Sequence, residues 1–150
     1  MSYTIEEFDA IKTKVLKYVL YKKRTEKEVR QKFESSFDEE ILEDVIEDLK
    51  ENGYISDSVY VQRAINEFIA LKNLSLKEIR YKLLAKGLSS DIIDEYFGEH
   101  YEQLEEFEKK SIKNIYYKKQ AGMELEEIVQ FLAKKGYKTD NIREVLSEVE

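Results

Sequence analysis

The chain has 150 residues, a formal net charge of −7, five glycines, no proline and no cysteine. The lack of cysteine excludes disulfides, thiolate catalysis and cysteine-bound zinc, and the acidic balance argues against simple polyanion binding. Strands need frequent turns, so the shortage of glycine and proline favours an all-α protein.

The first two elements read as a long helix followed by a short one. Apolar residues between Phe8 and Leu20 recur with the spacing of one buried helix face, which predicts an amphipathic helix over residues 5–23. Thr25 is followed three residues later by Glu28. This spacing is typical of a capping box, in which each side chain satisfies the other's backbone amide, and it predicts a short helix over residues 26–35.

A third, acidic helix follows. Ser36 is a candidate N-terminal cap, and Asn52-Gly53 is a stop signal, because glycine adopts the left-handed conformation without a Cβ penalty. Asp57 is placed to cap the helix that comes next. Residues 1–32 hold nine basic and five acidic residues, whereas residues 34–57 hold one basic and ten acidic residues. Basic and acidic segments therefore alternate along the chain.

The same order then returns twice. Ser75 and Glu78 repeat the capping box fifty residues after Thr25 and Glu28, and predict a short helix over residues 76–86 that Gly87 closes. Residues 124–132 form a third copy without the hydroxyl residue, closed by Gly136. Gly98 either ends the sixth helix or is absorbed into a longer one.

These repeats predict nine helices in three units of about fifty residues. Units of this size bury their apolar faces against their neighbours, so they are expected to stack into an elongated, curved array. We therefore predict one all-α domain over residues 1–150, built of three tandem three-helix repeats at about 5–57, 58–102 and 103–150.

The search for catalytic chemistry returns little. His100 is the only histidine, and no nucleophile or positioned partner surrounds it in the sequence, so a structural role is expected. The acidic stretches lack the spacing and the glycine of a calcium loop, and the isolated glycines form no phosphate-binding loop. We expect no enzyme activity, no metal site and no cofactor. No apolar run has the length of a membrane span and the N-terminus does not resemble a signal peptide, so a cytoplasmic protein is expected.

Three segments together resemble the RecX family of recombination regulators. They are residues 24–30, residues 49–60 with Asn52-Gly53-Tyr54-Ile55-Ser56-Asp57, and residues 79–88 with Lys86-Gly87-Leu88. The resemblance covers about residues 8–146. Arg24 and eight further positions match the family's motifs, and the resemblance implies that these eight are architectural: Glu28, Gly53, Asp57, Tyr60, Ile79, Leu83, Lys86 and Gly87.

The resemblance also implies a function. Proteins of this family bind the RecA recombinase within the groove of its filament on single-stranded DNA, and restrain its ATP hydrolysis, strand exchange and co-protease action in the SOS response. The partner is thus expected to be a RecA filament, bound by a monomer with weak or no direct DNA contact. Basic residues are the expected contacts: Arg24, Lys27, Arg30, Lys77 and Arg80.

Several other interpretations of the charge pattern stay open. If the units stack in register, the basic clusters would line one side of the array and steer it onto a charged partner. The same array could be an adaptor for a protein unrelated to recombination, or a nucleic-acid-binding module that uses its lysine and tyrosine faces. The cations could also serve only solubility and helix-dipole pairing.

Overall fold

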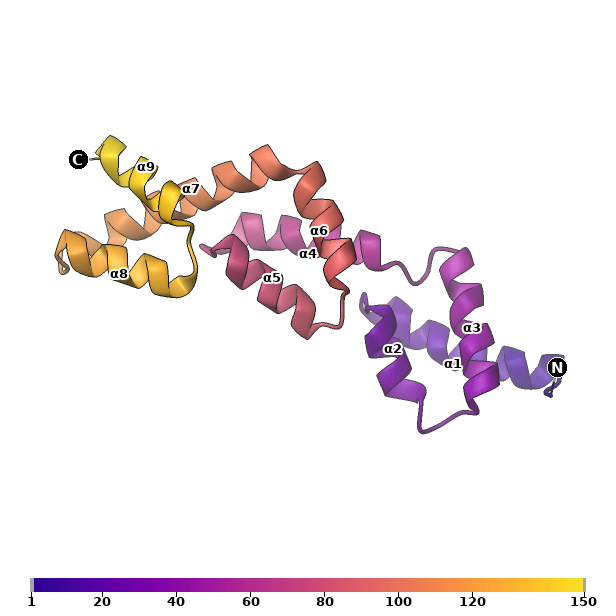
Figure 1. Ribbon diagram of the computed structural model, residues 1–150. Coiled ribbons are helices and arrows are strands. Elements are labelled where there is room, and N and C mark those ends of the chain that lie inside the picture. The colour runs from indigo at the N-terminus through magenta and orange to yellow at the C-terminus, as the bar shows by residue number, and fades with distance from the viewer. Residues whose placement is uncertain (1, 150) are drawn as a thin grey trace.

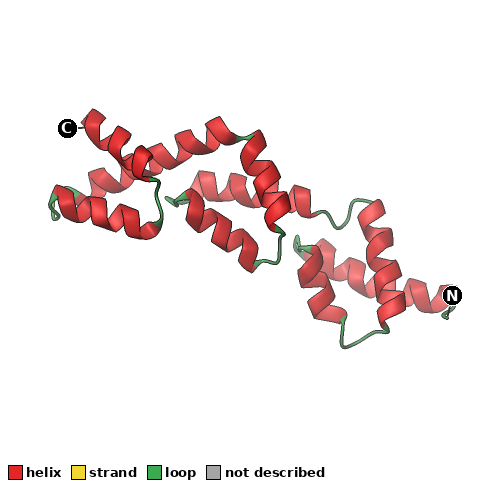
Figure 2. Ribbon diagram, in the orientation of Figure 1, coloured by secondary structure: helices red, strands yellow, loops and turns green. Residues whose placement is uncertain are grey.

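The protein is entirely helical over the part of the chain that the computed structural model describes, residues 2–149 (Figure 2). This confirms the all-α prediction, while residues 1 and 150 of the predicted domain lie outside the described part. The helices are α1 (Ile5–Tyr21), α2 (Glu26–Phe33), α3 (Glu39–Glu51), α4 (Asp57–Leu71), α5 (Leu76–Ala85), α6 (Ser90–Glu99), α7 (Tyr101–Lys119), α8 (Leu125–Lys135) and α9 (Thr139–Val149).

The helices follow one another along an elongated molecule, with the two ends of the chain far apart (Figure 1). Three apolar clusters form the interior. The first joins α1, α2 and α3, the second joins α4, α5 and α6, and the third joins α7, α8 and α9. Helix α7 is shared, because Leu104 in its first turn belongs to the second cluster, whereas Ile112 and Ile115 belong to the third.

The clusters are compatible with three stacked units. The predicted boundaries near residues 57 and 102 coincide with the starts of α4 and α7. Because α7 contributes to two cores, the second and third units are continuous rather than separate bodies. The division into repeats remains a prediction.

The capping boxes of Thr25 and Ser75 are where the sequence pattern places them. The Thr25 hydroxyl accepts from the Glu28 amide at 3.1 Å, and the Glu28 carboxylate accepts from the Thr25 amide at 2.9 Å. Ser75 and Glu78 reproduce this arrangement at 3.0 and 2.9 Å. These reciprocal bonds satisfy amides that a helix start otherwise leaves unpaired.

Two predicted caps are wrong. Asp38 rather than Ser36 caps α3, because the helix starts at Glu39 and the Asp38 carboxylate accepts from the Glu40 amide at 3.0 Å. Ser56 caps α4, which leaves the Asp57 carboxylate for another partner described below. Gly98 lies inside α6 and does not end it.

Candidate partner-binding surface

We call α1–α3, α4–α6 and α7–α9 the first, second and third helix groups. A buried hydroxyl joins the first group to the second. The Thr25 side chain is fully buried, and its hydroxyl donates to the carbonyl oxygen of Lys86 at 2.7 Å. A hydroxyl has one proton to donate and two lone pairs, so it can cap α2 and bind the end of α5 together. The start of α2 is thereby tied to the residue that follows α5 in the next group.

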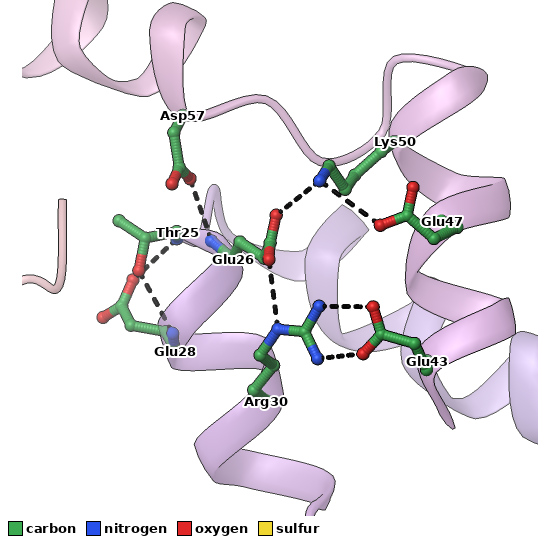
Figure 3. A network of polar contacts seen from close by, with 8 residues as sticks. All are labelled: Thr25, Glu26, Glu28, Arg30, Glu43, Glu47, Lys50 and Asp57. Carbon is green, nitrogen blue, oxygen red and sulfur yellow. Dashed lines mark hydrogen bonds and ion pairs between the residues drawn. The ribbon is translucent and has the colours of Figure 1, made fainter. Parts of the chain in front are cut away.

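A carboxylate completes this first junction. The Asp57 side chain, from the first residue of α4, accepts from the Glu26 amide at 2.9 Å (Figure 3). It thus satisfies a second free N–H at the start of α2, a position where the helix dipole favours negative charge. Burial raises the pKa of the Asp57 carboxyl above its ordinary value, although the hydrogen bond from Glu26 opposes that rise.

A lysine stem packs on a glycine at the same place. Gly87 has a φ of +93°, and a Cβ added there would lie 2.6 Å from the Cβ of Lys27. Glycine is therefore needed both for the left-handed turn that ends α5 and for the close approach of the lysine.

The second junction repeats the first almost contact for contact. Ser75 is fully buried and its hydroxyl donates to the carbonyl oxygen of Lys135 at 2.7 Å. Gly136 has a φ of +97°, and a Cβ there would lie 2.9 Å from the Cβ of Lys77. The amide of Leu76, at the position of Glu26 in the first junction, binds a carboxylate of the following group.

That carboxylate is Glu108, which is fully buried in α7. It accepts from the amide of Leu76 at 2.7 Å, from the amide of Lys138 at 2.8 Å and from Asn141 Nδ2 at 3.1 Å. One side chain therefore holds the starts of α5 and α9 against the middle of α7. A buried carboxylate is costly unless it is fully hydrogen-bonded, and these three donors meet that requirement.

Arg30 is engaged inside the first group. Its guanidinium forms a two-pronged ion pair with Glu43 of α3, with Nη2 at 3.0 Å, and its Nε donates to Glu26 at 3.0 Å (Figure 3). Lys50 adds a further cation 2.9 Å from Glu26. The hydrogen bond from Arg30 lowers the pKa of Glu43. The basic α2 and the acidic α3 thus neutralise each other in part.

Arg80 occupies the equivalent place in the second group. It pairs with Asp94 of α6 and lies 5.7 Å from the ring centre of Phe97. Arg24 stacks on the Tyr18 ring at 4.1 Å, with its Nε buried and without a hydrogen-bond partner in residues 2–149. All three arginines therefore have intramolecular contacts, and their role in partner binding remains a prediction.

Lys27 and Lys77 differ from these arginines. Both side chains are exposed, and no carboxylate of the described residues lies within 4.0 Å of either ammonium group. Their stems are held on Gly87 and Gly136, so each ammonium extends into solvent from a junction. Among the five predicted contact residues, these two present a charge without a carboxylate partner in residues 2–149, and each does so from the second residue of a helix, α2 or α5.

The remaining chemistry is sparse. Among residues 2–149 no three His, Asp or Glu side chains cluster in a way that could hold a metal ion. His100 lies between α6 and α7, where its ring stacks on Tyr96 at 4.0 Å and contacts the Tyr96 carbonyl oxygen at 3.0 Å. None of the helices in the described part is both long and apolar enough to cross a bilayer.

Comparison with known proteins connects this architecture to one family, although no protein-family model matches the chain. The regulatory protein RecX of Finegoldia magna is 34% identical over 137 residues, which make up 87% of this chain and 67% of the relative. The chain belongs to the RecX family of regulatory proteins. RecX of Staphylococcus haemolyticus is 30% identical over 139 residues, and the chain spans about half of that relative's length, 52%.

Solved structures agree on the fold of the RecX family. A crystal structure of RecX from Lactobacillus salivarius matches with a TM-score of 0.85 at 20% identity, over 97% of each chain. A second crystal structure of regulatory protein RecX matches with a TM-score of 0.79 at 20% identity, over 93% of this chain and 73% of the other. These structures confirm the fold, and the 34% identical relative confirms the family resemblance predicted from the sequence.

Several residues that match the RecX motifs lie in the first junction. Glu28, Asp57, Lys86 and Gly87 all take part in the contacts between α2 and the next helix group, and Lys86 Nζ lies 4.0 Å from the Glu28 carboxylate. The other matching residues serve the interior or a turn. Ile79 and Leu83 are core residues of the second cluster, Tyr60 packs against that cluster, and Gly53 takes a φ of +80° after α3.

Glu108 and Asn141 were not among the residues singled out from the sequence. Glu108 lies four residues from both Leu104 and Ile112, in the stripe of α7 that faces the core. An acid in a buried stripe is unusual, and this spacing alone could have identified it as a structural carboxylate.

Proposed function

We propose that this protein is a non-catalytic regulator of the RecA recombinase that binds the RecA filament on single-stranded DNA. Membership of the RecX family supports this proposal. The observation that carries it is the repeated display of Lys27 and Lys77 at two chemically equivalent junctions of an elongated array.

Such an array suits a partner that itself repeats. A filament offers the same surface on each subunit, so equivalent cations on successive units can meet equivalent sites on successive subunits. Linking two weak contacts raises the overall affinity, because the second contact forms within the complex. Occupation of the filament groove would restrain ATP hydrolysis, strand exchange and the co-protease action of the SOS response.

Protein contacts rather than DNA contacts should supply most of the binding. The net charge of −7 opposes approach to a bare polyanion, and several cations are already paired with carboxylates inside the protein. The free lysines can instead meet carboxylates on the filament surface. We further propose that the protein acts as a monomer in the cytoplasm.

Co-sedimentation tests this proposal. RecA filaments on single-stranded DNA and the same DNA alone are pelleted with increasing amounts of this protein. Saturable recovery with the filament and little recovery with DNA alone is expected. A double variant, Lys27→Gln with Lys77→Gln, should bind more weakly, whereas Lys134→Gln changes an exposed lysine of α8 and should bind normally.

Recovery that follows the DNA whether or not RecA is present would instead identify a nucleic-acid-binding module. Absence of recovery in both samples would leave an adaptor for another protein. Either result would overturn the proposed function.

A further inference from the structure

A groove of about 510 Å³ lies where the end of α4 meets the middle of α7. Its apolar part is formed by Ile69, Leu71 and Phe107, and its charged part by Lys72, Glu106 and Lys110. The volume lies within the range of about 300–1,000 Å³ that is typical of ligand-binding clefts. None of the contacts of the two junctions involves these six residues.

Leu71 is the first unusual feature of this groove. It is the last residue of α4 and its side chain is 70% exposed, whereas Ile69 and Phe107 beside it are half-buried. A large apolar side chain left in water next to an apolar floor is a site that another apolar side chain could cover.

The charges of the groove select the kind of ligand. Lys72 and Lys110 are exposed, and no carboxylate of residues 2–149 lies within 4.0 Å of either ammonium group. Glu106 is the only acidic residue of the lining. Lys109 lies 3.5 Å from it and 2.6 Å from Glu144, so the Glu106 carboxylate shares its counter-ion with Glu144. Two cations that share a groove with an apolar patch, and that have no carboxylate partner among residues 2–149, favour an anionic ligand with an apolar part.

A hydrogen bond links the two walls of the groove beside Lys72. Asn114 Nδ2 of α7 donates to Asn73 Oδ1 at 3.1 Å. Because the walls are tied at this point, the groove suits a short segment beside Leu71 better than a long strand.

We propose that this groove binds a short acidic peptide segment of the protein's partner. One bulky apolar side chain of the segment covers Leu71, and carboxylates on either side of it pair with Lys72 and Lys110. This inference rests on the proposed function only for which protein supplies the segment. A single strand of nucleic acid fits less well. It requires a continuous track of cations with stacking aromatics, and in this groove the carboxylate of Glu106 interrupts the cations.

Fluorescence anisotropy with a synthetic peptide tests the proposal directly. The probe is fluorescein-labelled Asp-Glu-Phe-Glu-Asp, titrated with the full chain in the absence of RecA and DNA. Saturable binding is expected. The double variant Lys72→Gln with Lys110→Gln, and separately Leu71→Ser, should each weaken it by about tenfold or more, the scale of one lost charged or apolar contact.

Four controls make the result specific. Lys134→Gln should bind as the unchanged protein does, and a peptide with amides in place of the carboxylates should bind poorly. The charge-reversed variant Lys72→Glu with Lys110→Glu should instead bind a Lys-Lys-Phe-Lys-Lys peptide, which also shows that the variant groove is intact. Unlabelled oligothymidylate should not displace the acidic peptide.

Absence of peptide binding, or binding that none of the groove variants changes, would overturn this inference. Displacement by the oligonucleotide would overturn it too, since the groove would then accept a phosphate chain. Filament recovery by the unchanged protein keeps the two proposals distinguishable. If the unchanged protein binds the filament but not the peptide, the groove proposal alone is rejected. If it binds the peptide but is not recovered with the filament, the proposed function alone is rejected.

Discussion

The hydroxyl of Thr25 donates to the carbonyl oxygen of Lys86 at 2.7 Å, across 61 residues of sequence. Ser75 and Lys135 make the same bond across 60 residues, at the same distance. In each case the hydroxyl also caps its own helix, so one side chain both starts a helix and fixes the next helix group against it. The two junctions therefore share one chemical design, and its parts can be tested singly.

Thr25→Val should destabilise the protein more than loss of an ordinary cap does. Removing the cap alone costs about 1 kcal/mol, and leaving the Lys86 carbonyl without its donor adds about 1–3 kcal/mol. Urea unfolding followed by circular dichroism measures the sum. Thr4→Val is the matched control, because Thr4 caps α1 through the same kind of capping box but is exposed and joins no second group. Equal losses for the two variants would show that the junction bond contributes nothing.

Gly87→Ala should be more harmful than Gly53→Ala, although both glycines have positive φ. The left-handed backbone costs a residue with a Cβ about 1–2 kcal/mol at either position. At Gly87 the new methyl would also lie 2.6 Å from Lys27 Cβ, whereas at Gly53 no atom lies within 4 Å. The clash should add about 1–3 kcal/mol in urea unfolding, as overpacking does elsewhere. Indistinguishable unfolding curves would contradict close packing at the junction.

Glu108→Gln should loosen the second junction. The carboxylate accepts from two backbone amides and from Asn141, whereas an amide side chain places an NH₂ group against one of these donors. A loss of about 1–3 kcal/mol is expected for each buried group left unpaired. Hydrogen exchange of the Leu76 and Lys138 amides should quicken as well.

Glu102→Gln provides the control for this change, since Glu102 is exposed on the same helix. It removes one charge from the first turn of α7, so it should lower the stability by less than about 1 kcal/mol and leave the exchange of the two amides unchanged. If Glu108→Gln behaved like Glu102→Gln, the buried carboxylate would not be holding α5 and α9.

Acid should weaken the ion pair of Arg30 and Glu43. The hydrogen bond from Arg30 lowers the pKa of Glu43 in the folded protein. A carboxyl with a lowered folded pKa stabilises the protein above its ordinary pKa of about 4.5, and this contribution is lost as the pH falls through the folded value. Urea midpoints measured from about pH 7 to about pH 3 should therefore fall less steeply for Glu43→Gln and for Arg30→Met.

The pH profile of the unchanged protein must be compared with those of the two variants, because Asp57 changes the stability with pH in the opposite direction to Glu43. Its raised pKa means that the folded protein takes up a proton more readily than the unfolded chain, so acid favours the folded state at this residue. Asp57 is unchanged in both variants and cancels in the difference. Parallel pH profiles for all three proteins would contradict a stabilising role for the Arg30 pair.

The local patterns of the sequence predicted the helices and the capping boxes of Thr25 and Ser75, since both depend on residues three or four positions apart. They could not predict the junctions. Thr25 looks like any cap, and nothing near it identifies the Lys86 carbonyl as a partner. Asp57 was misassigned for the same reason, because an acid at a helix start is locally a good cap, and only the fold brings it to the Glu26 amide.

The basic residues show the same limit. Their clustering in the sequence indicated a charged surface, but their partners are set by packing between helices. Arg30 and Arg80 pair with acids on the third helix of their own group. The stems of Lys27 and Lys77 instead pack against a glycine of the next group. Sequence alone treats these four residues alike. Among residues 2–149, the structure pairs the two arginines with carboxylates and leaves the two lysines without a carboxylate partner.

ATP hydrolysis by RecA on single-stranded DNA, titrated with this protein, tests the central claim most directly. Inhibition below one molecule per RecA subunit is predicted, with the Lys27→Gln and Lys77→Gln double variant requiring a higher concentration and Lys134→Gln behaving normally. Unchanged hydrolysis at saturating protein would contradict the account. It would also be contradicted if the unchanged protein and both variants inhibited equally, and only at concentrations at which they bind the DNA without RecA.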